Sequence, residues 1–148
     1  MTLIEKLNND MKGALKEGAV FKLSTLRMVV SAVHNLEIEK RGRGAGELID
    51  EEVMNVLRKE AKKRKEAAEI YGSVNRDDLK EKEARELEII QSYLPAELGD
   101  LEIGDMINKV LASGEKEFGK IMKKVMSEVG GRAEGGRVGE LIKKNLVI

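Results

Sequence analysis

The chain contains no cysteine and no tryptophan, and its 148 residues include one proline and an aromatic fraction of only 3%. Without cysteine it can form no disulfide, no thiolate zinc site and no cysteine nucleophile. The scarcity of aromatic rings argues against a platform on which unpaired nucleic-acid bases stack in succession. Several catalytic and binding classes are therefore excluded before any motif is considered.

An excess of charge of one sign is also missing, because 27 basic residues balance 27 acidic ones. No apolar run reaches the roughly 20 residues that a membrane-spanning helix needs. The N-terminal segment lacks a signal-peptide core, since Lys6 and Asp10 interrupt its apolar residues. These features predict a cytoplasmic protein with no membrane partner.

Apolar residues recur at helical spacing along the chain, and no strand-like alternation persists anywhere. A capping box of Thr2 and Glu5 is expected to begin the first helix, and Gly18 is expected to end it. Further helices are expected over residues 22–41, from Asp50 to a turn at 72–76, from a cap at Asp77 or Asp78 to Tyr93, from 99–100 to Gly114, and around 120–128 and 138–146. The predicted fold class is all-α.

Pro95 is the only proline, and it divides this succession of helices. Proline ends a helix and disfavours helical geometry in the residue before it, here Leu94. We place a domain boundary at this point. The expected organisation is an N-terminal, four-helix bundle-like domain over residues 1–95 and a small three-helix domain over residues 96–148.

The third expected helix carries an arginine on its apolar face. Val53, Leu57 and Ala61 share that face with Arg64. A paired, partly buried arginine is the favoured interpretation, and a ligand-binding role is the alternative. Together with Lys59 and Lys63, Arg64 defines a secondary basic helix that could follow phosphates or simply be a solvated face.

A glycine-rich basic elbow, residues 130–137, separates the last two expected helices. Glycine permits positive φ and close backbone approach, so this elbow is either a tight corner or a surface that faces a ligand. The free N–H groups at the start of the following helix suit an anion such as phosphate. The candidate nucleic-acid-binding residues in and around the elbow are Lys120, Lys123, Lys124, Arg132, Gly135, Gly136, Arg137 and Lys143.

The segment GKIMKKVMSEVGGRAEGGRVGELIKKNL, at residues 119–146, resembles the closing motif of the YqeY family. The same domain is found at the C-terminus of the B subunit of tRNA-dependent amidotransferases. Earlier blocks resemble that family in the same order: Leu26-Arg27-Met28 with Asn35 and residues 37–41, then Asp50-Glu51-Glu52-Val53 with Lys59-Glu60 and Lys63-Arg64, then Arg76-Asp77-Asp78-Leu79 and Tyr93-Leu94-Pro95.

The resemblance implies a domain that helps to hold tRNA, as similar appended modules do in the amidotransferase and in some glutaminyl-tRNA synthetases. The family's matching positions are Lys120, Lys123, Arg132, Gly135, Gly136 and Lys143. The implied partners are tRNA and either an aminoacyl-tRNA synthetase or an amidotransferase subunit. The glycines could equally serve only as the hinge of the elbow.

Catalytic groups are sparse in this sequence. The one histidine, His34, has Ser31 three residues before it on the same expected helix, which is a common surface coincidence. No phosphate-binding loop and no metal-binding histidine pair is present, so neither a cofactor nor a metal is expected. We therefore expect a non-catalytic tRNA-binding module, although homology would class the chain with carbon–nitrogen ligases that use glutamine as amido donor.

Two alternatives remain open at this stage. The first is a protein-interaction adaptor, in which the sixth helix would present Ile121, Met122, Val125 and Met126 to a partner. The second is an auxiliary subunit of an amidotransferase.

Overall fold

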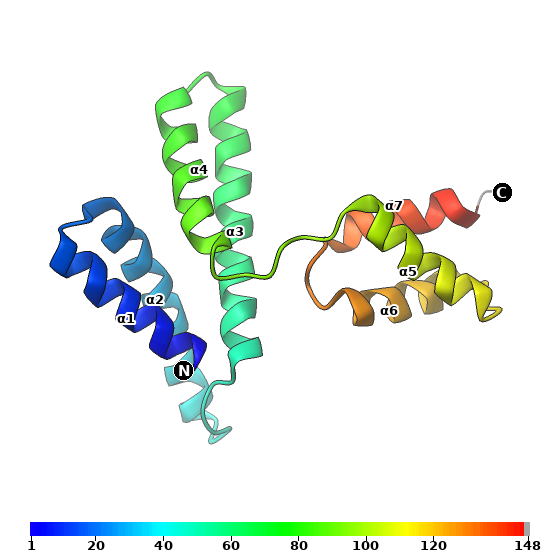
Figure 1. Ribbon diagram of the computed structural model, residues 1–148, viewed down its shortest axis with the longest axis horizontal. Helices are drawn as coiled ribbons and strands as arrows, with labels where there is room; N and C mark the ends of the chain where they lie inside the picture. Colours follow the sequence, from blue (N-terminus) through cyan, green and yellow to red (C-terminus); the bar gives the residue numbers. More distant parts are fainter. Residues whose placement is uncertain (147–148) are drawn as a thin grey trace. The chain divides into compact units, whose positions relative to one another are not determined.

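A computed structural model describes residues 1–146, which form seven α-helices and no strand. The helices are α1 (Leu3–Glu17), α2 (Val20–Gly42), α3 (Asp50–Ser73), α4 (Asp77–Gln91), α5 (Asp100–Ala112), α6 (Phe118–Val129) and α7 (Gly135–Leu146) (Figure 1). The all-α fold class is confirmed. No helix among the described residues is long and apolar enough to span a bilayer.

The chain divides into two compact units, Met1–Leu94 and Pro95–Ile148. Each unit has its own cluster of buried apolar side chains. The last two residues of the predicted C-terminal domain, 147 and 148, lie outside the described part of the chain.

The N-terminal unit consists of two helical hairpins, α1 with α2 and α3 with α4 (Figure 1). The lower half of α3 also contacts the first hairpin, and α2 contacts α4. Its core is aliphatic and consists of Leu7, Leu26, Val29, Val33, Val53, Leu57 and Ile90. Val53 and Leu57 lie on the apolar face that the sequence predicts for the third helix, and burial of each of the larger core side chains contributes about 1.5–3 kcal/mol.

The expected start and end of α1 are both present. The Thr2 hydroxyl accepts the N–H of Glu5, whose carboxylate accepts the N–H of Thr2 in return. Gly18 ends the helix at φ 70°, in the left-handed region that glycine enters at low cost. The Leu3 N–H also donates to Oδ1 of Asp50 at 3.0 Å, which ties the start of α1 to the start of α3.

The expected cap of α4 is wrong. Arg76 occupies the N-cap position and makes no capping bond with its side chain, whereas Asp77 and Asp78 lie in the first turn. The pKa of Asp78 is lowered, first by its hydrogen bond with Arg76 and then by the backbone N–H of Leu79. The aspartates therefore act on the helix dipole from within the first turn.

Arg64 is buried and paired, as the sequence indicates. Its Nε donates to Oε2 of Glu86 on α4 at 3.3 Å, and its Nη1 donates to the carboxylate and the carbonyl of Glu60. Nη2 lies 3.8 Å from the sulfur of Met28 on α2. One guanidinium therefore links three helices in the interior of the N-terminal unit.

Removing that guanidinium should destabilise the unit strongly. The Arg64→Ala change leaves the Glu86 carboxylate buried and uncompensated, while Glu60 retains Lys63 at 3.4 Å. We expect a loss of about 3 kcal/mol, measured by urea unfolding. The apolar double variant Arg64→Met with Glu86→Leu should recover most of that loss; if it unfolds as readily as Arg64→Ala, burial of an unpaired charge is not the cause.

Tyr93 joins the end of the second hairpin to α1. Its hydroxyl donates to Oδ2 of Asp10 at 2.6 Å. Burial raises the pKa of Tyr93, and the hydrogen bond to the Asp10 carboxylate raises it further. The folded state therefore holds the phenolic proton more tightly than the unfolded chain does.

This bond should make stability fall at alkaline pH. Because the folded pKa is the higher one, the stabilisation is complete below the ordinary pKa of 10.0 and is lost as pH rises above it. Tyr93→Phe should cost about 1 kcal/mol at neutral pH. It should also flatten the decline above pH 10.0, measured as unfolding free energy against pH. Parallel declines in both proteins would contradict this assignment.

The C-terminal unit is a bundle in which α5, α6 and α7 each contact the other two. Its core is formed by Leu98, Ile103, Ile107, Ile121, Val125, Val129, Val138 and Ile142. Gly130 and Gly131 open the turn after α6 with φ values of 57° and 83°. The Leu98 N–H donates to the carbonyl of Arg132 at 2.9 Å, so the segment before α5 is fastened to this turn.

Candidate nucleic-acid interface

The elbow between α6 and α7 is shorter than the sequence indicates. Helix α7 begins at Gly135, so Gly135, Gly136 and Arg137 form its first turn instead of a loop. The side of α7 that carries Gly135 and Gly139 faces α6. A Cβ at Gly135 would lie 3.7 Å from Cε of Met122, and a Cβ at Gly139 would lie 3.7 Å from Cζ of Phe118.

Gly135 and Gly139 therefore form a smooth strip on which α6 rests. Glycines four residues apart lie on one side of a helix, where they allow close approach of a second helix. Gly136 lies outside this contact, because no atom falls within 4 Å of a Cβ placed there. Of the two predicted glycines, Gly135 serves helix packing, and Gly136 leaves open space at the start of α7.

Arg137 is occupied within the C-terminal unit. Its Nε donates to Oδ1 of Asp100 at 2.8 Å, Nη2 donates to the same oxygen, and Nη1 donates to the carbonyl of Leu98 at 2.9 Å. The guanidinium thus links the first turn of α7 to the start of α5 by hydrogen bonds. This cation was predicted to face a ligand, and the structure gives it an intramolecular clamp.

Arg132 lies in the turn and is half-buried. Its Nε donates to the carbonyl of Val129 at 3.3 Å. Among the contacts of residues 1–146, Arg132 has no carboxylate partner. The Val129 carbonyl therefore orients the Arg132 guanidinium, and no described carboxylate neutralises its charge.

The three lysines of α6 differ in their partners. Lys120 lies 3.5 Å from the carboxylate of Glu117, and Lys124 lies 3.8 Å from that of Glu115. The pKa of Glu115 is lowered, first by the backbone N–H of Glu117 and also by Lys120, Lys116 and Lys124. Because both lysines are largely exposed, these ion pairs are weak and can exchange for another anion.

Lys123 and Lys143 are the exposed cations of this set that no described carboxylate neutralises. Lys143 projects from α7 with its Nζ 5.7 Å from the ring centre of Phe118, at the start of α6. The sequence analysis did not single out Phe118. Its signal in the sequence is an aromatic residue at the start of a basic helix, and in the structure the ring is 37% accessible.

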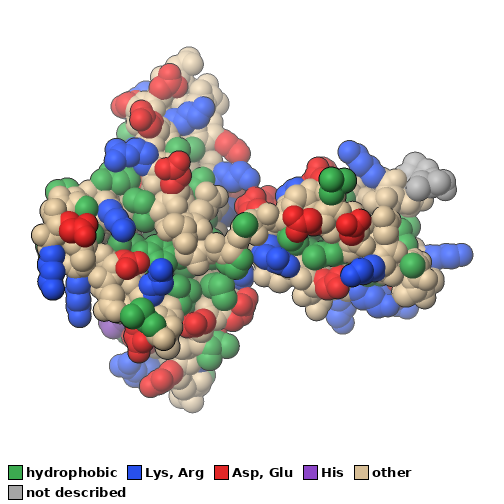
Figure 2. All heavy atoms as spheres, in the orientation of Figure 1, with side chains coloured by type: hydrophobic (Ala, Val, Ile, Leu, Met, Phe, Trp, Pro, Cys, Tyr) green, Lys and Arg blue, Asp and Glu red, His purple; other side chains and the backbone are tan. Residues whose placement is uncertain are grey.

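The candidate cations without a described carboxylate partner are therefore Lys123, Lys143 and Arg132, and Lys120 and Lys124 are candidates whose weak ion pairs can exchange. Figure 2 shows lysine and arginine side chains along the side of this unit where α6 lies. Phosphate is the anion that such a separated set of cations can follow along a backbone.

One of the three candidate residues of the secondary basic helix, Arg64, is not available to a ligand. Lys59 is exposed and Lys63 is paired with Glu60, but Arg64 is held inside the unit by Glu60 and Glu86. Because the Arg64 guanidinium is buried and donates hydrogen bonds to Glu60 and Glu86, it is not available to a ligand. The paired interpretation of Arg64 is confirmed.

No catalytic constellation is formed around His34. Its Nδ1 lies 3.2 Å from Glu37 on an exposed face of α2. Within residues 1–146, no group of His, Asp or Glu side chains is placed to hold a metal ion.

The surface expected for the adaptor hypothesis is largely internal. Ile121 and Val125 have no exposed area and belong to the core of the C-terminal unit. Met122 and Met126 are half-buried against α7. This arrangement removes the apolar face that α6 was expected to present.

A family model for the Yqey-like protein matches residues 4–146. The chain belongs to the YqeY-like family. The match confirms the resemblance and covers both structural units, so the N-terminal hairpins are part of the family domain.

Several proteins that are similar to this chain share one name. The protein "Altered inheritance of mitochondria protein 41, mitochondrial" of Pyrenophora tritici-repentis is 26% identical over 137 residues, covering 88% of this chain and 73% of the relative. The protein of that name from Meyerozyma guilliermondii is 29% identical, covering 86% and 66%. The one from Saccharomyces cerevisiae is also 29% identical, covering 85% and 69%.

These names contradict the expectation of a cytoplasmic protein, because the relatives are named as mitochondrial. Composition excluded disulfides and membrane-spanning helices, but it has no power to distinguish one cellular compartment from another.

The clamp of Arg137 can be tested by a double-mutant cycle. Arg137→Ala should destabilise the C-terminal unit by about 1–2 kcal/mol, because it removes bonds to Asp100 and to the Leu98 carbonyl. Asp100→Asn should cost less, since the bond to the carbonyl remains. Hydrogen exchange of α7 amides would measure both, and strictly additive losses would show that the two side chains are not coupled.

Proposed function

We propose that this protein is a non-catalytic, RNA-associated module whose C-terminal unit binds the phosphate backbone of tRNA. The observation that carries the proposal is the set of exposed cations without described carboxylate partners, Lys123 and Lys143, on helices packed around the α6–α7 turn. Lysine ammonium groups release condensed counterions when they contact phosphates, which drives binding without any base recognition.

Recognition of shape fits this surface better than recognition of sequence. Double-stranded RNA is read mainly through its backbone and its 2′-hydroxyls. The C-terminal unit offers one half-exposed phenylalanine, which cannot form a row of stacking rings. We therefore expect little dependence on the tRNA sequence.

The family supports this function at a coarse level. The closing motif resembles the C-terminal domain of the amidotransferase B subunit, where a similar domain helps to hold tRNA. Under this proposal amide transfer is carried out by another protein, such as an amidotransferase subunit or an aminoacyl-tRNA synthetase.

Binding of total tRNA to the double variant Lys123→Ala, Lys143→Ala tests the proposal. We expect roughly tenfold weaker binding at low salt, because two phosphate contacts are lost. The slope of log affinity against log salt should fall by about 1.5. Filter binding over a series of salt concentrations measures both quantities.

The matched control is Lys12→Ala with Lys82→Ala, which removes two exposed positive charges from the N-terminal unit. This control should retain wild-type affinity. Equal losses in both double variants would mean that net charge, and not the C-terminal surface, governs binding. No binding of wild-type protein at low salt would refute the function itself.

A further inference from the structure

A cleft in the N-terminal unit is left unused by the proposed function. It has a volume of about 450 Å³ and is lined by residues 19–22 at the start of α2 and by Arg85, Glu88 and Ile89 of α4. This volume lies within the range of sites that hold small ligands or individual side chains of a partner. The two walls are joined by a contact between Phe21 and Arg85, whose guanidinium carbon lies 4.1 Å from the ring centre.

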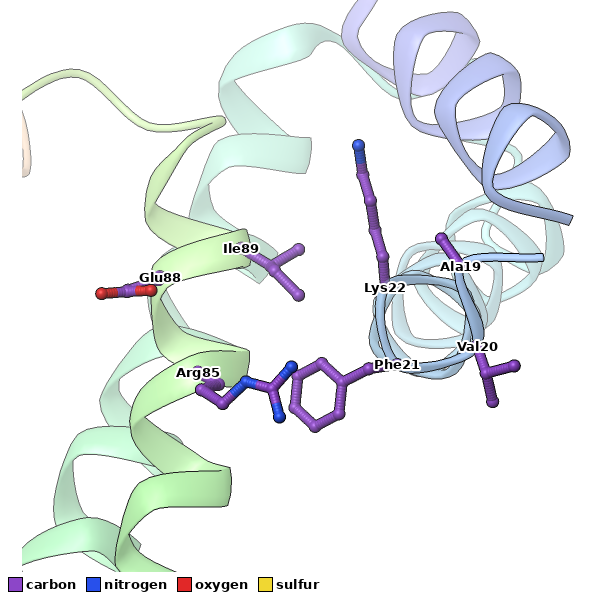
Figure 3. A pocket seen from close by; sticks show the side chains of 7 residues that line it. All are labelled: Ala19, Val20, Phe21, Lys22, Arg85, Glu88 and Ile89. Carbon is purple, nitrogen blue, oxygen red and sulfur yellow. The ribbon is translucent and has the colours of Figure 1, made fainter. Parts of the chain in front are cut away.

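Figure 3 shows how the lining side chains are directed. Phe21 and Arg85 point toward each other across the cleft, and Ile89 points into it, whereas the carboxylate of Glu88 points away. Val20 lies at the outer rim and is 76% exposed. The cleft thus combines an apolar wall with a cationic edge.

That edge is not neutralised by the chain itself. Within residues 1–146, neither Lys22 nor Arg85 forms an ion pair, and the one recorded contact of the Arg85 guanidinium is with an aromatic ring. Two cations next to exposed apolar carbon are complementary to a segment that carries both carboxylates and an apolar side chain. Stacking on Phe21 holds the Arg85 fork in place, which reduces the entropy lost when it binds a carboxylate.

We propose that this cleft is the docking site for an acidic peptide segment of a partner protein, with an apolar side chain seated against Phe21 and Ile89 and flanking carboxylates on Arg85 and Lys22. A peptide fits better than a phosphate backbone because most of the lining is apolar, at Ala19, Val20, Phe21 and Ile89. A phosphate chain would leave those carbons exposed or would cover them with its own charge.

No local pattern predicts this site, because Phe21 and Arg85 lie 64 positions apart and are brought together by the packing of α2 against α4. The proposal does not depend on the tRNA surface, which belongs to the other unit.

Selection from a display library of random short peptides on the whole protein tests the proposal, with the double variant Lys22→Ala, Arg85→Ala as counter-target. Peptides that combine acidic and apolar residues should be enriched on the wild type and lost on the variant. By fluorescence anisotropy, the selected peptides should bind the variant roughly tenfold more weakly. They should bind the Lys12→Ala, Lys82→Ala control as they bind the wild type.

A charge exchange separates docking from loss of folding. The variant Lys22→Glu, Arg85→Glu should reject the selected peptide and accept its counterpart in which each acid is replaced by lysine. Enrichment of peptides without acids, or unchanged binding to both charge variants, overturns the proposal. Loss of tRNA affinity in Lys22→Ala, Arg85→Ala, with no peptide enriched on the wild type, would also overturn it and assign the cleft to RNA.

Discussion

The close approach of α7 to α6 is the constraint on which the C-terminal surface depends. Met122 and Phe118 lie 3.7 Å from the positions that a Cβ would take at Gly135 and Gly139, so an alanine there would make ordinary van der Waals contact. A side chain much larger than alanine at either position would have to displace Met122 or Phe118. The same contact brings Lys143 above the Phe118 ring, so packing and the placement of charge have one cause.

Arginine and lysine have different roles in this protein. Arg64 and Arg137 each use several donors of their planar guanidinium within the fold, one between helices of the N-terminal unit and one between α7 and the start of α5. The lysines of α6 and α7 remain exposed, as strongly hydrated point charges on flexible stems do. A chain with no net charge can therefore still present cations selectively, because some of them, such as Arg64 and Arg137, are paired within their own unit.

Local signals in the sequence were sufficient for the fold class and for several details. The Thr2–Glu5 capping box, the end of α1 at Gly18 and the pairing of Arg64 all follow from short-range pattern. The start of α7 was missed because Gly135 has low intrinsic helix propensity. In the structure Gly135 lies against Met122 of α6, and no short window of sequence contains both residues.

The candidate site was predictable as a segment but not as a set of free charges. Its cations look alike in the sequence, and their availability depends on partners that are distant in the chain. Asp100 lies 37 positions before Arg137 and pairs with its guanidinium. Arg85 in the cleft of the N-terminal unit shows the opposite case. Its distant neighbour is the ring of Phe21, which does not neutralise its charge as a carboxylate would.

The two proposed surfaces, one in each unit, differ in chemistry: separated lysines on α6 and α7, and an apolar cleft with a cationic edge between α2 and α4. Catalysis would need reacting groups held within hydrogen-bond reach of each other. Binding through separated cations and an apolar cleft needs no such convergence. Under both proposals one chain would hold an RNA and an acidic partner at the same time, which would raise the effective concentration of each near the other.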